Sequence, residues 1–424
     1  MAIVLFVSLI VFFALGVPIA IAMGLASAIA LLYEGATPLL VLVQRSFTSV
    51  DSFPLMAIPF FILAGTLMEF GGISKRLINF ANALTGHFAG GLAIVTVVTA
   101  MFFSAISGSS AATTAALGSI LIPAMISKGY NRNFAGAIQA VSGELGVIIP
   151  PSIPLILYGV AAGVSIGDLF LAGMIPGILI GLSLILAVSI LAKKYKFPRE
   201  EKKSVPEIGK AFKDAFLALM MPVIILGGIY GGIFTPTEAA GVAVAYALIV
   251  GVFIYKEIKL NRLVKILTEA SITTAVVMFI ISSAGLFGWI LTMENVPREV
   301  AEFITSFSDN PLVFLLLVNL FLIFVGMFME TNASIIILTP LLVPIAAELG
   351  IDPVHFGIIM IVNLALGMCT PPLGVNLFIS AEIANIRLEQ ITRGMLPFYI
   401  VMALILILIT YVPQITLFLP NLLD

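Results

Sequence analysis

Two stretches that lie 221 residues apart share a Gly-Pro-Pro pattern inside apolar sequence. Residues 146–152 read Gly-Val-Ile-Ile-Pro-Pro-Ser, and residues 367–373 read Gly-Met-Cys-Thr-Pro-Pro-Leu. The two stretches lie within long apolar segments, 133–163 and 353–386. Consecutive prolines interrupt a helix because they lack the backbone N–H and clash with the preceding turn. We therefore predict two helices that are broken part-way across a membrane.

The same offset relates other residues over about 60 positions of the chain. The matched pairs are Leu117 and Leu338, Pro123 and Pro344, Gly129 and Gly350, Gly136 and Gly357, Gly173 and Gly394, Met174 and Met395, and Pro176 and Pro397. A ladder of glycines and prolines in constant register indicates an internal duplication. We expect each half to contain a re-entrant hairpin, a broken helix and a closing span, with the two halves inverted relative to each other.

Composition places the chain in a lipid bilayer. It is 61% hydrophobic and only 10% charged, whereas soluble domains carry about 25% charged residues. Its 424 residues allow roughly a dozen spans of about 20 residues each. The sequence thus predicts an all-α polytopic membrane protein.

The same counts exclude several classes of function. A net charge of −2 gives no basic surface for nucleic acid, and the single cysteine excludes a disulfide framework or a thiolate metal site. No P-loop motif is present. No histidine accompanies the Ser-Gly pairs as a protease would need, so we predict that the protein is not an enzyme and binds no transition metal.

We predict five regions along the chain. Two loops, 193–213 and 256–265, carry 12 of the 20 Lys and Arg residues and are expected in the cytoplasm. The stretches 73–86 and 258–268 are amphipathic and are expected to lie along the membrane interface. The regions are 1–88, N-terminal scaffold helices; 89–192, a first repeat with hairpin 89–127 and broken helix 133–163; 193–310, the basic loop and further scaffold helices; 311–393, a second repeat with hairpin 311–349 and broken helix 353–386; and 394–424, a C-terminal transmembrane helix.

Each predicted hairpin has a polar tip, at 107–114 and at 330–334. Hydroxyl, amide and freed carbonyl oxygens suit a weakly bound monovalent cation, and the ends of broken helices add partial charges. Alternatively, small residues there simply allow close helix packing. Glu144 lies in apolar sequence and is either a functional carboxylate or a hydrogen-bonded structural one.

These motifs resemble the large membrane subunit of tripartite ATP-independent periplasmic (TRAP) transporters. The resemblance covers essentially the whole chain. The motifs that carry it are residues 59–65 (Pro-Phe-Phe-Ile-Leu-Ala-Gly), 103–113 (Phe-Ser-Ala-Ile-Ser-Gly-Ser-Ser-Ala-Ala-Thr), 146–152, 326–331 (Gly-Met-Phe-Met-Glu-Thr) and 370–374 (Thr-Pro-Pro-Leu-Gly).

The resemblance implies a sodium-coupled importer of the bacterial inner membrane that works by an elevator motion of a transport domain against a scaffold. It implies a periplasmic substrate-binding protein and a small four-helix membrane subunit as partners. Because the chain begins in the large-subunit region, the small subunit is expected to be a separate polypeptide. The substrate would be an organic carboxylate of the C4-dicarboxylate or sialic acid type.

The resemblance also implies site residues, with Na⁺ as the coupling ion at two or more positions. The sodium-binding candidates are Ser107, Gly108, Ser110, Thr113, Gly146, Pro150, Thr331, Asn332, Gly367 and Thr370. The substrate-binding candidates are Ser109, Ser152, Glu330, Asn376 and Arg387. A stand-alone sodium/carboxylate symporter and an ion channel remain as alternatives, although a channel does not require two matched broken helices.

Overall fold

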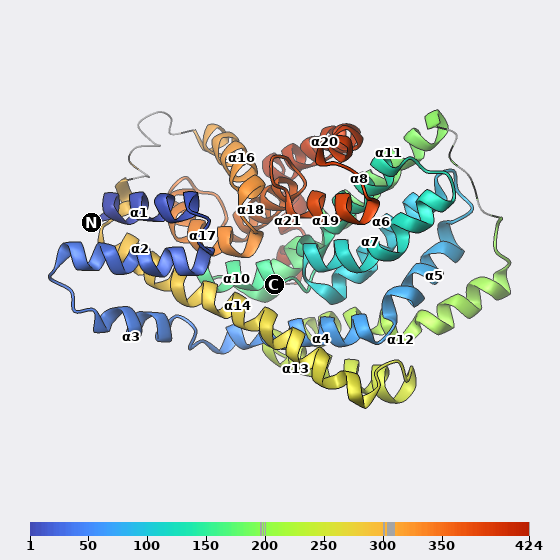
Figure 1. Ribbon diagram of the computed structural model, residues 1–424, viewed down its shortest axis with the longest axis horizontal. Coiled ribbons are helices and arrows are strands. Elements are labelled where there is room, and N and C mark those ends of the chain that lie inside the picture. Colours follow the sequence, from blue (N-terminus) through green and yellow to red (C-terminus); the bar gives the residue numbers. More distant parts are fainter. Residues whose placement is uncertain (196, 198, 200, 300–301, 303–309, 424) are drawn as a thin grey trace.

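The computed structural model describes residues 1–195, 197, 199, 201–299, 302 and 310–423, and within these ranges it contains helices and no strand (Figure 1). The predicted all-α class is confirmed. Lys196 of the predicted basic loop lies outside the described residues, as do parts of the predicted regions 193–310 and 394–424.

Among the described residues, nine helices are long and apolar enough to span a membrane. A tenth candidate is the bent pair Arg132–Ile148 and Ile153–Ala162, whose axes differ by 43°. This number is below the predicted dozen because several apolar segments form helices of only 10–17 residues. The short helices include one arm of the first hairpin and both arms of the second broken helix.

The N-terminal region begins with two apolar helices that fold back on each other. Gly16, with a φ of +74°, and Pro18 separate them. The helices are α1 (Ala2–Ala14), α2 (Ile19–Glu34), α3 (Leu40–Thr48), η1 (Phe53–Met56), α4 (Ala57–Phe70) and the amphipathic α5 (Ile73–Thr85).

The two predicted repeats have the same order of helices, except that the four-residue helix α9 of the first has no counterpart in the second. The first comprises α6 (Gly91–Ser107), α7 (Ser110–Ser127), α8 (Arg132–Gly143), α9 (Leu145–Ile148), α10 (Ile153–Ala162) and α11 (Ile166–Tyr195). The second comprises α16 (Pro311–Phe328), α17 (Thr331–Glu348), α18 (Pro353–Met368), α19 (Val375–Ala384) and α20 (Leu388–Tyr411). The start and the end of α7 and α17 are each 221 residues apart, the offset found in the sequence.

The remaining helices connect the halves and complete the C-terminus. They are α12 (Val205–Tyr230), α13 (Pro236–Leu248), the π-helical turn η2 (Ile249–Ile254), α14 (Leu260–Met293), α21 (Gln414–Leu417) and α22 (Pro420–Leu423).

Two predicted boundaries are wrong. The stretch 258–268 is not a separate amphipathic element, because from Leu260 onward it forms the first turns of the continuous helix α14. The last long helix begins at Leu388, not at 394, since Gln390 accepts a hydrogen bond from the Arg387 backbone N–H and caps the helix there. Pro397 is accommodated inside this helix.

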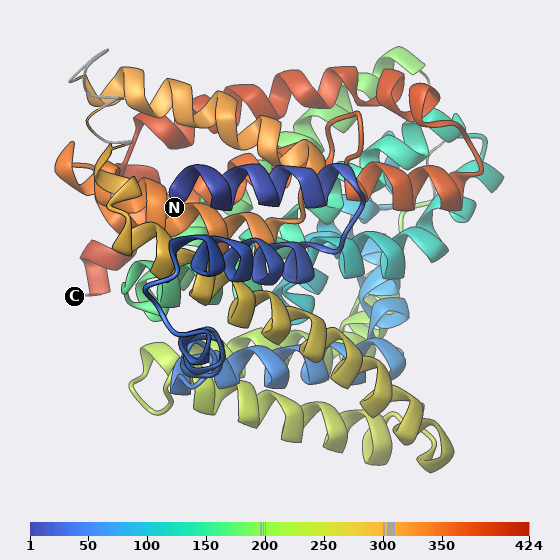
Figure 2. The same ribbon diagram turned by 60° about the vertical axis from the view of Figure 1, so that its left-hand side comes forward.

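The helices form two groups. In both views α4, α12, α13 and α14 lie on one side of the molecule, and α16 and α20 lie on the other (Figures 1 and 2). The two predicted repeats interlock, since α10 packs against α17, and α19 packs against both α7 and α8. This interlocking positions the polar tips of both hairpins close to helices of the opposite half.

Candidate functional site

The first hairpin tip gathers polar groups around one carbonyl oxygen. Gly108, with a φ of +61°, ends α6, and the hydroxyl of Ser109 accepts a hydrogen bond from Ala112 N at 3.4 Å and caps α7. The hydroxyls of Thr113 and Ser107 both donate to the Ser109 carbonyl, at 2.8 and 3.4 Å. Because both hydroxyls act as donors in these bonds, their oxygens retain lone pairs that can accept.

The first broken helix is hydrogen-bonded to this tip. The break spans residues 149–152, between α9 and α10, and Ile153 N donates to the Gly108 carbonyl at 3.3 Å. The hydroxyl of Ser152 donates to Val147 O at 2.6 Å and accepts from Leu155 N at 3.5 Å. Ser152 therefore joins the two sides of the break and caps α10.

Gly146 lets the broken helix approach the tip. A Cβ atom at this position would lie 2.5 Å from Ser109 O and 2.7 Å from Thr113 Oγ1, closer than non-bonded atoms can pack. The structure therefore brings together the predicted residues Ser107, Gly108, Thr113 and Gly146.

The second tip differs in charge at the equivalent position. Glu330 takes the place of Ser109 and caps α17, with its carboxylate accepting from Asn332 N at 2.9 Å and from Ala333 N at 3.4 Å. The Asn332 side-chain amide also donates to this carboxylate, at 2.8 Å, while its Oδ1 is buried without a hydrogen-bond partner. The Glu330 carboxylate is thus hydrogen-bonded to the first turn of its own helix.

The second break joins its own hairpin in the same way as the first. Gly374 N donates to the Met327 carbonyl at 3.1 Å, just before α19 begins. The buried Thr331 hydroxyl contacts the sulfur of Met368 at 2.9 Å. The backbones of Gly326 and Gly367 pack closely against each other. A Cβ atom on Gly367 would lie only 2.5 Å from the Gly326 Cα, so this contact requires glycine.

One predicted residue links the halves directly. Asn376, near the start of α19, is fully buried and donates from Nδ2 to the Ser110 hydroxyl of the first tip, at 2.5 Å. Because hydrogen-bonded groups are in contact, the second broken helix and the first hairpin form one polar site.

Arg387 is not brought to this site. It is exposed and lies beyond the C-terminal end of α19, whereas Asn376 lies at the N-terminal end. The intervening ten-residue helix is about 15 Å long. The expectation that Arg387 contacts substrate here is not supported.

Residues 6–415 match the family model "Tripartite ATP-independent periplasmic transporter, DctM component". The chain belongs to the DctM family of TRAP transporters. It is a multi-pass bacterial inner-membrane protein and a transporter subunit, not an enzyme, as the motifs predicted.

The DctM family includes relatives that are similar over nearly the whole chain. The "isethionate TRAP transporter permease protein DctMQ" of Oleidesulfovibrio alaskensis is 47% identical over 98% of this chain, which spans 66% of that relative's length. The C4-dicarboxylate large permease protein DctM of Pseudomonas aeruginosa is 44% identical, covering 94% of this chain and 93% of the relative. The sialic acid large permease protein SiaM of Vibrio cholerae is 42% identical, covering 96% and 95%.

The fold is also found in a solved structure with little sequence similarity. The YdaH transporter of Alcanivorax borkumensis has a TM-score of 0.60, with 88% of each chain covered and 14% identity. At this identity the likeness concerns the fold alone.

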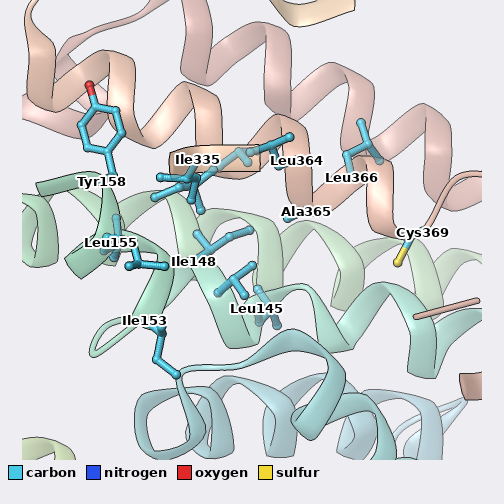
Figure 3. Close-up of a cluster of buried hydrophobic side chains, with 14 of the residues drawn as sticks. Leu145, Ile148, Ile153, Leu155, Tyr158, Ile335, Leu364, Ala365, Leu366 and Cys369 are labelled. Carbon is cyan, nitrogen blue, oxygen red and sulfur yellow. The ribbon is translucent and has the colours of Figure 1, made fainter. Parts of the chain in front are cut away.

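Sequence reasoning missed two tyrosines of the DctM-family chain, one that connects the halves and one that holds the second break within the second half. Tyr158 on α10 donates from its hydroxyl to the Pro353 carbonyl at 2.6 Å, and its ring lies against Gly357. Tyr399 on α20 donates to the Cys369 carbonyl in the second break at 2.7 Å. Figure 3 shows Tyr158 and Ile153 of the first half in the same buried cluster as Ile335 and Leu364 of the second. A buried tyrosine needs a partner for its hydroxyl, but the sequence does not say which carbonyl serves.

Proposed function

We propose that this protein is the large permease subunit of a sodium-coupled, binding-protein-dependent transporter that imports an organic carboxylate across the inner membrane. Its partners in this proposal are a small membrane subunit and a periplasmic substrate-binding protein. The observation that carries the proposal is the pair of hairpin tips, each hydrogen-bonded to its own broken helix by Ile153 N and Gly374 N. Interrupted backbone at matched positions of two halves is typical of a secondary transporter's substrate site.

The tip residues fit sodium. Sodium is a hard cation, and the oxygens available at the tips belong to hydroxyl, amide and carbonyl groups, together with the Glu330 carboxylate at the second tip. Asn332 Oδ1 is buried with no donor, which is costly unless a cation or a donor faces it. One position would use Ser107, Gly108, Ser110, Thr113, Gly146 and Pro150, and the other would use Thr331, Asn332, Gly367 and Thr370. Bound sodium would supply the positive charge that holds each tip against its break.

The two helix caps support an asymmetric division of roles. Helices α7 and α10 begin at neutral serines, Ser109 and Ser152, so their N-termini keep a positive partial charge that attracts an anion. The carboxylate of Glu330 offsets that charge at α17 and would repel a substrate carboxylate. We therefore place the substrate nearer to Ser109 and Asn376, and we assign Glu330 to the sodium side of the second tip.

The substrate class is inferred from the relatives. Their names specify isethionate, C4-dicarboxylates and sialic acid, which are all small organic acids whose charged group is a planar or pyramidal oxyanion. Helix N-termini and side-chain amides recognise such oxyanions by donating hydrogen bonds. A carboxylate is favoured because it is the common group of two of the three classes.

An elevator motion is part of this proposal. Helices of both halves interlock around the site, through α10 with α17 and α19 with α7 and α8, so they would move as one body. Helices α4, α12, α13 and α14 lie together on the other side (Figure 1) and would form the scaffold.

The experiment is uptake into proteoliposomes that contain this chain with its small membrane subunit and the binding protein. Radiolabelled succinate and sialic acid are offered with an inward sodium gradient, with potassium replacing sodium in the control. Uptake is expected only with sodium and binding protein present. Uptake that persists in potassium would contradict sodium coupling, and uptake without binding protein would favour a stand-alone symporter. If the substrate concentration inside the liposomes never rises above the concentration outside, the result would favour a channel.

A further inference from the structure

Glu144 is an isolated carboxylate in the interior of the protein. It lies between α8 and α9, and its side chain is fully buried. Neither carboxylate oxygen has a hydrogen-bond partner, and none of the ion pairs among the described residues involves Glu144. The Cys369 thiol lies within hydrogen-bonding reach of the Glu144 carboxylate, but its single hydrogen is directed to the Ala140 carbonyl at 3.1 Å.

Two further buried oxygens without hydrogen-bond partners lie on residues next to those that contact Glu144. Asn376 also lies beside Cys369, with its Nδ2 3.7 Å from the Cys369 sulfur, and it donates to Ser110. Its Oδ1 is buried without a partner. The Thr114 hydroxyl on α7 is likewise buried and unpartnered, and it lies so close to Gly143 that a Cβ there would overlap it.

The oxygens of Glu144, Asn376 and Thr114 are buried without hydrogen-bond partners, and none of the ion pairs among the described residues supplies a positive charge to Glu144. Each buried acceptor without a donor destabilises the protein, and an unpaired buried carboxylate does so considerably more. A cation bound among these oxygens would satisfy the carboxylate, the amide oxygen and the hydroxyl together. One carboxylate among neutral oxygens matches a monovalent charge.

We propose that Glu144, the amide oxygen of Asn376 and the hydroxyl of Thr114 bind a sodium ion at a site separate from the two hairpin-tip positions. The site extends the proposed sodium coupling and rests on it for the choice of ion. Its ligands come from α7 and the α8–α9 junction in the first half and from α19 in the second. A cation bound there fastens the second broken helix to the first half.

The test is equilibrium binding of ²²Na⁺ to the purified full chain. Glu144→Gln keeps the shape of the side chain and removes its charge, and it is expected to bind one sodium fewer per protein than the wild type. Glu144→Asp retains the charge and is expected to keep the sodium count with weaker affinity. The matched control is Glu382→Gln, which removes the same charge from an exposed position on α19 and is expected to leave the count unchanged.

An unchanged sodium count in Glu144→Gln overturns the proposal and assigns Glu144 as a neutral buried acid. If that variant does not fold, Thr114→Val provides the test, because it removes one neutral ligand with little change of shape and is expected to weaken sodium binding several-fold. Unchanged affinity in that variant also overturns the site. Because binding is measured without transport, uptake that proves independent of a sodium gradient contradicts the proposed coupling without removing this site.

Discussion

The side-chain amide of Asn376 donates a hydrogen bond to the hydroxyl of Ser110 at 2.5 Å. The two residues are 266 positions apart in the chain, and they connect the second broken helix to the first hairpin tip. Both side chains are buried, so loss of either partner leaves the other without its hydrogen bond in a site that excludes water.

The Ser110–Asn376 pair is expected to act as a unit. Ser110→Ala and Asn376→Ala should each raise the sodium concentration for half-maximal uptake, and the double variant should be less impaired than the sum, with a coupling of about 0.5–3 kcal/mol. A double-mutant cycle of sodium half-saturation in proteoliposomes measures this coupling. The control is a second double-mutant cycle in which Ser119→Ala takes the place of Ser110→Ala. Ser119 is an exposed α7 residue whose hydroxyl donates a hydrogen bond within its own helix. Additive effects in the Ser110 cycle would contradict the direct coupling.

Gly146 should not tolerate a methyl group. Because a Cβ would lie 2.5 Å from Ser109 O, Gly146→Ala must separate the first break from the first tip, at a cost of about 1–3 kcal/mol. We expect a lower thermal unfolding temperature and a sodium half-saturation raised about tenfold, which corresponds to about 1.4 kcal/mol. Gly241→Ala is the control, since that α13 glycine has open space around it. Equal behaviour of the two variants would argue against the close approach.

Reciprocal changes at the two caps test the division of roles between the tips. Ser109→Asp places a carboxylate at the first tip, where it should repel the substrate anion and raise its KM by about tenfold, in keeping with the 0.3–2 kcal/mol of helix-terminus interactions. Glu330→Gln removes the carboxylate at the second tip and should weaken sodium dependence more than substrate affinity. Both parameters are read from initial rates of uptake at varied sodium and substrate. If Ser109→Asp left KM unchanged, the anion would have to bind away from α7.

Relative movement of the two helix groups can be stopped with a cross-link. Gly288 on α14 faces Pro340 on α17, with a Cβ at Gly288 lying 3.7 Å from the Pro340 ring. The variant Gly288→Cys/Pro340→Cys is bridged by a disulfide or by Hg²⁺ and is then expected to lose uptake. Uptake should return when excess dithiothreitol reduces the disulfide or removes the Hg²⁺. Each single-cysteine variant controls for the substitutions, because the native Cys369 is buried. Full uptake by the cross-linked protein would contradict an elevator motion across this contact.

Much of the fold follows from local sequence. The paired prolines at 150–151 and 371–372 interrupt both helices, because two consecutive residues without an N–H remove two helical hydrogen bonds and clash with the preceding turn. Single prolines such as Pro397 are accommodated inside helices. The tips at Gly108 and Glu330 lie where polar residues separate apolar runs. The break between α1 and α2 follows from Gly16 and Pro18 for the same reasons.

The boundaries that failed depended on information outside the local pattern. The stretch 258–268 is amphipathic and could have formed a separate surface helix, but in the structure it continues into α14. The start of α20 was set by the cap between Arg387 and Gln390, not by Gly394. Helix ends defined by side-chain caps are decided by a few polar contacts, which hydropathy does not record.

The sequence by itself determined the membrane setting, the duplicated order of helices, the two breaks and the family, because each of these depends on residue types at fixed spacings along the chain. Only the tertiary structure decided which oxygens meet. Asn376 reached Ser110 in the opposite half, Arg387 was left at the far end of α19, and Glu144 was enclosed without a partner. The physical reason is that contacts between segments hundreds of residues apart are set by how helix faces pack, and glycines such as Gly146 determine how closely two backbones can approach.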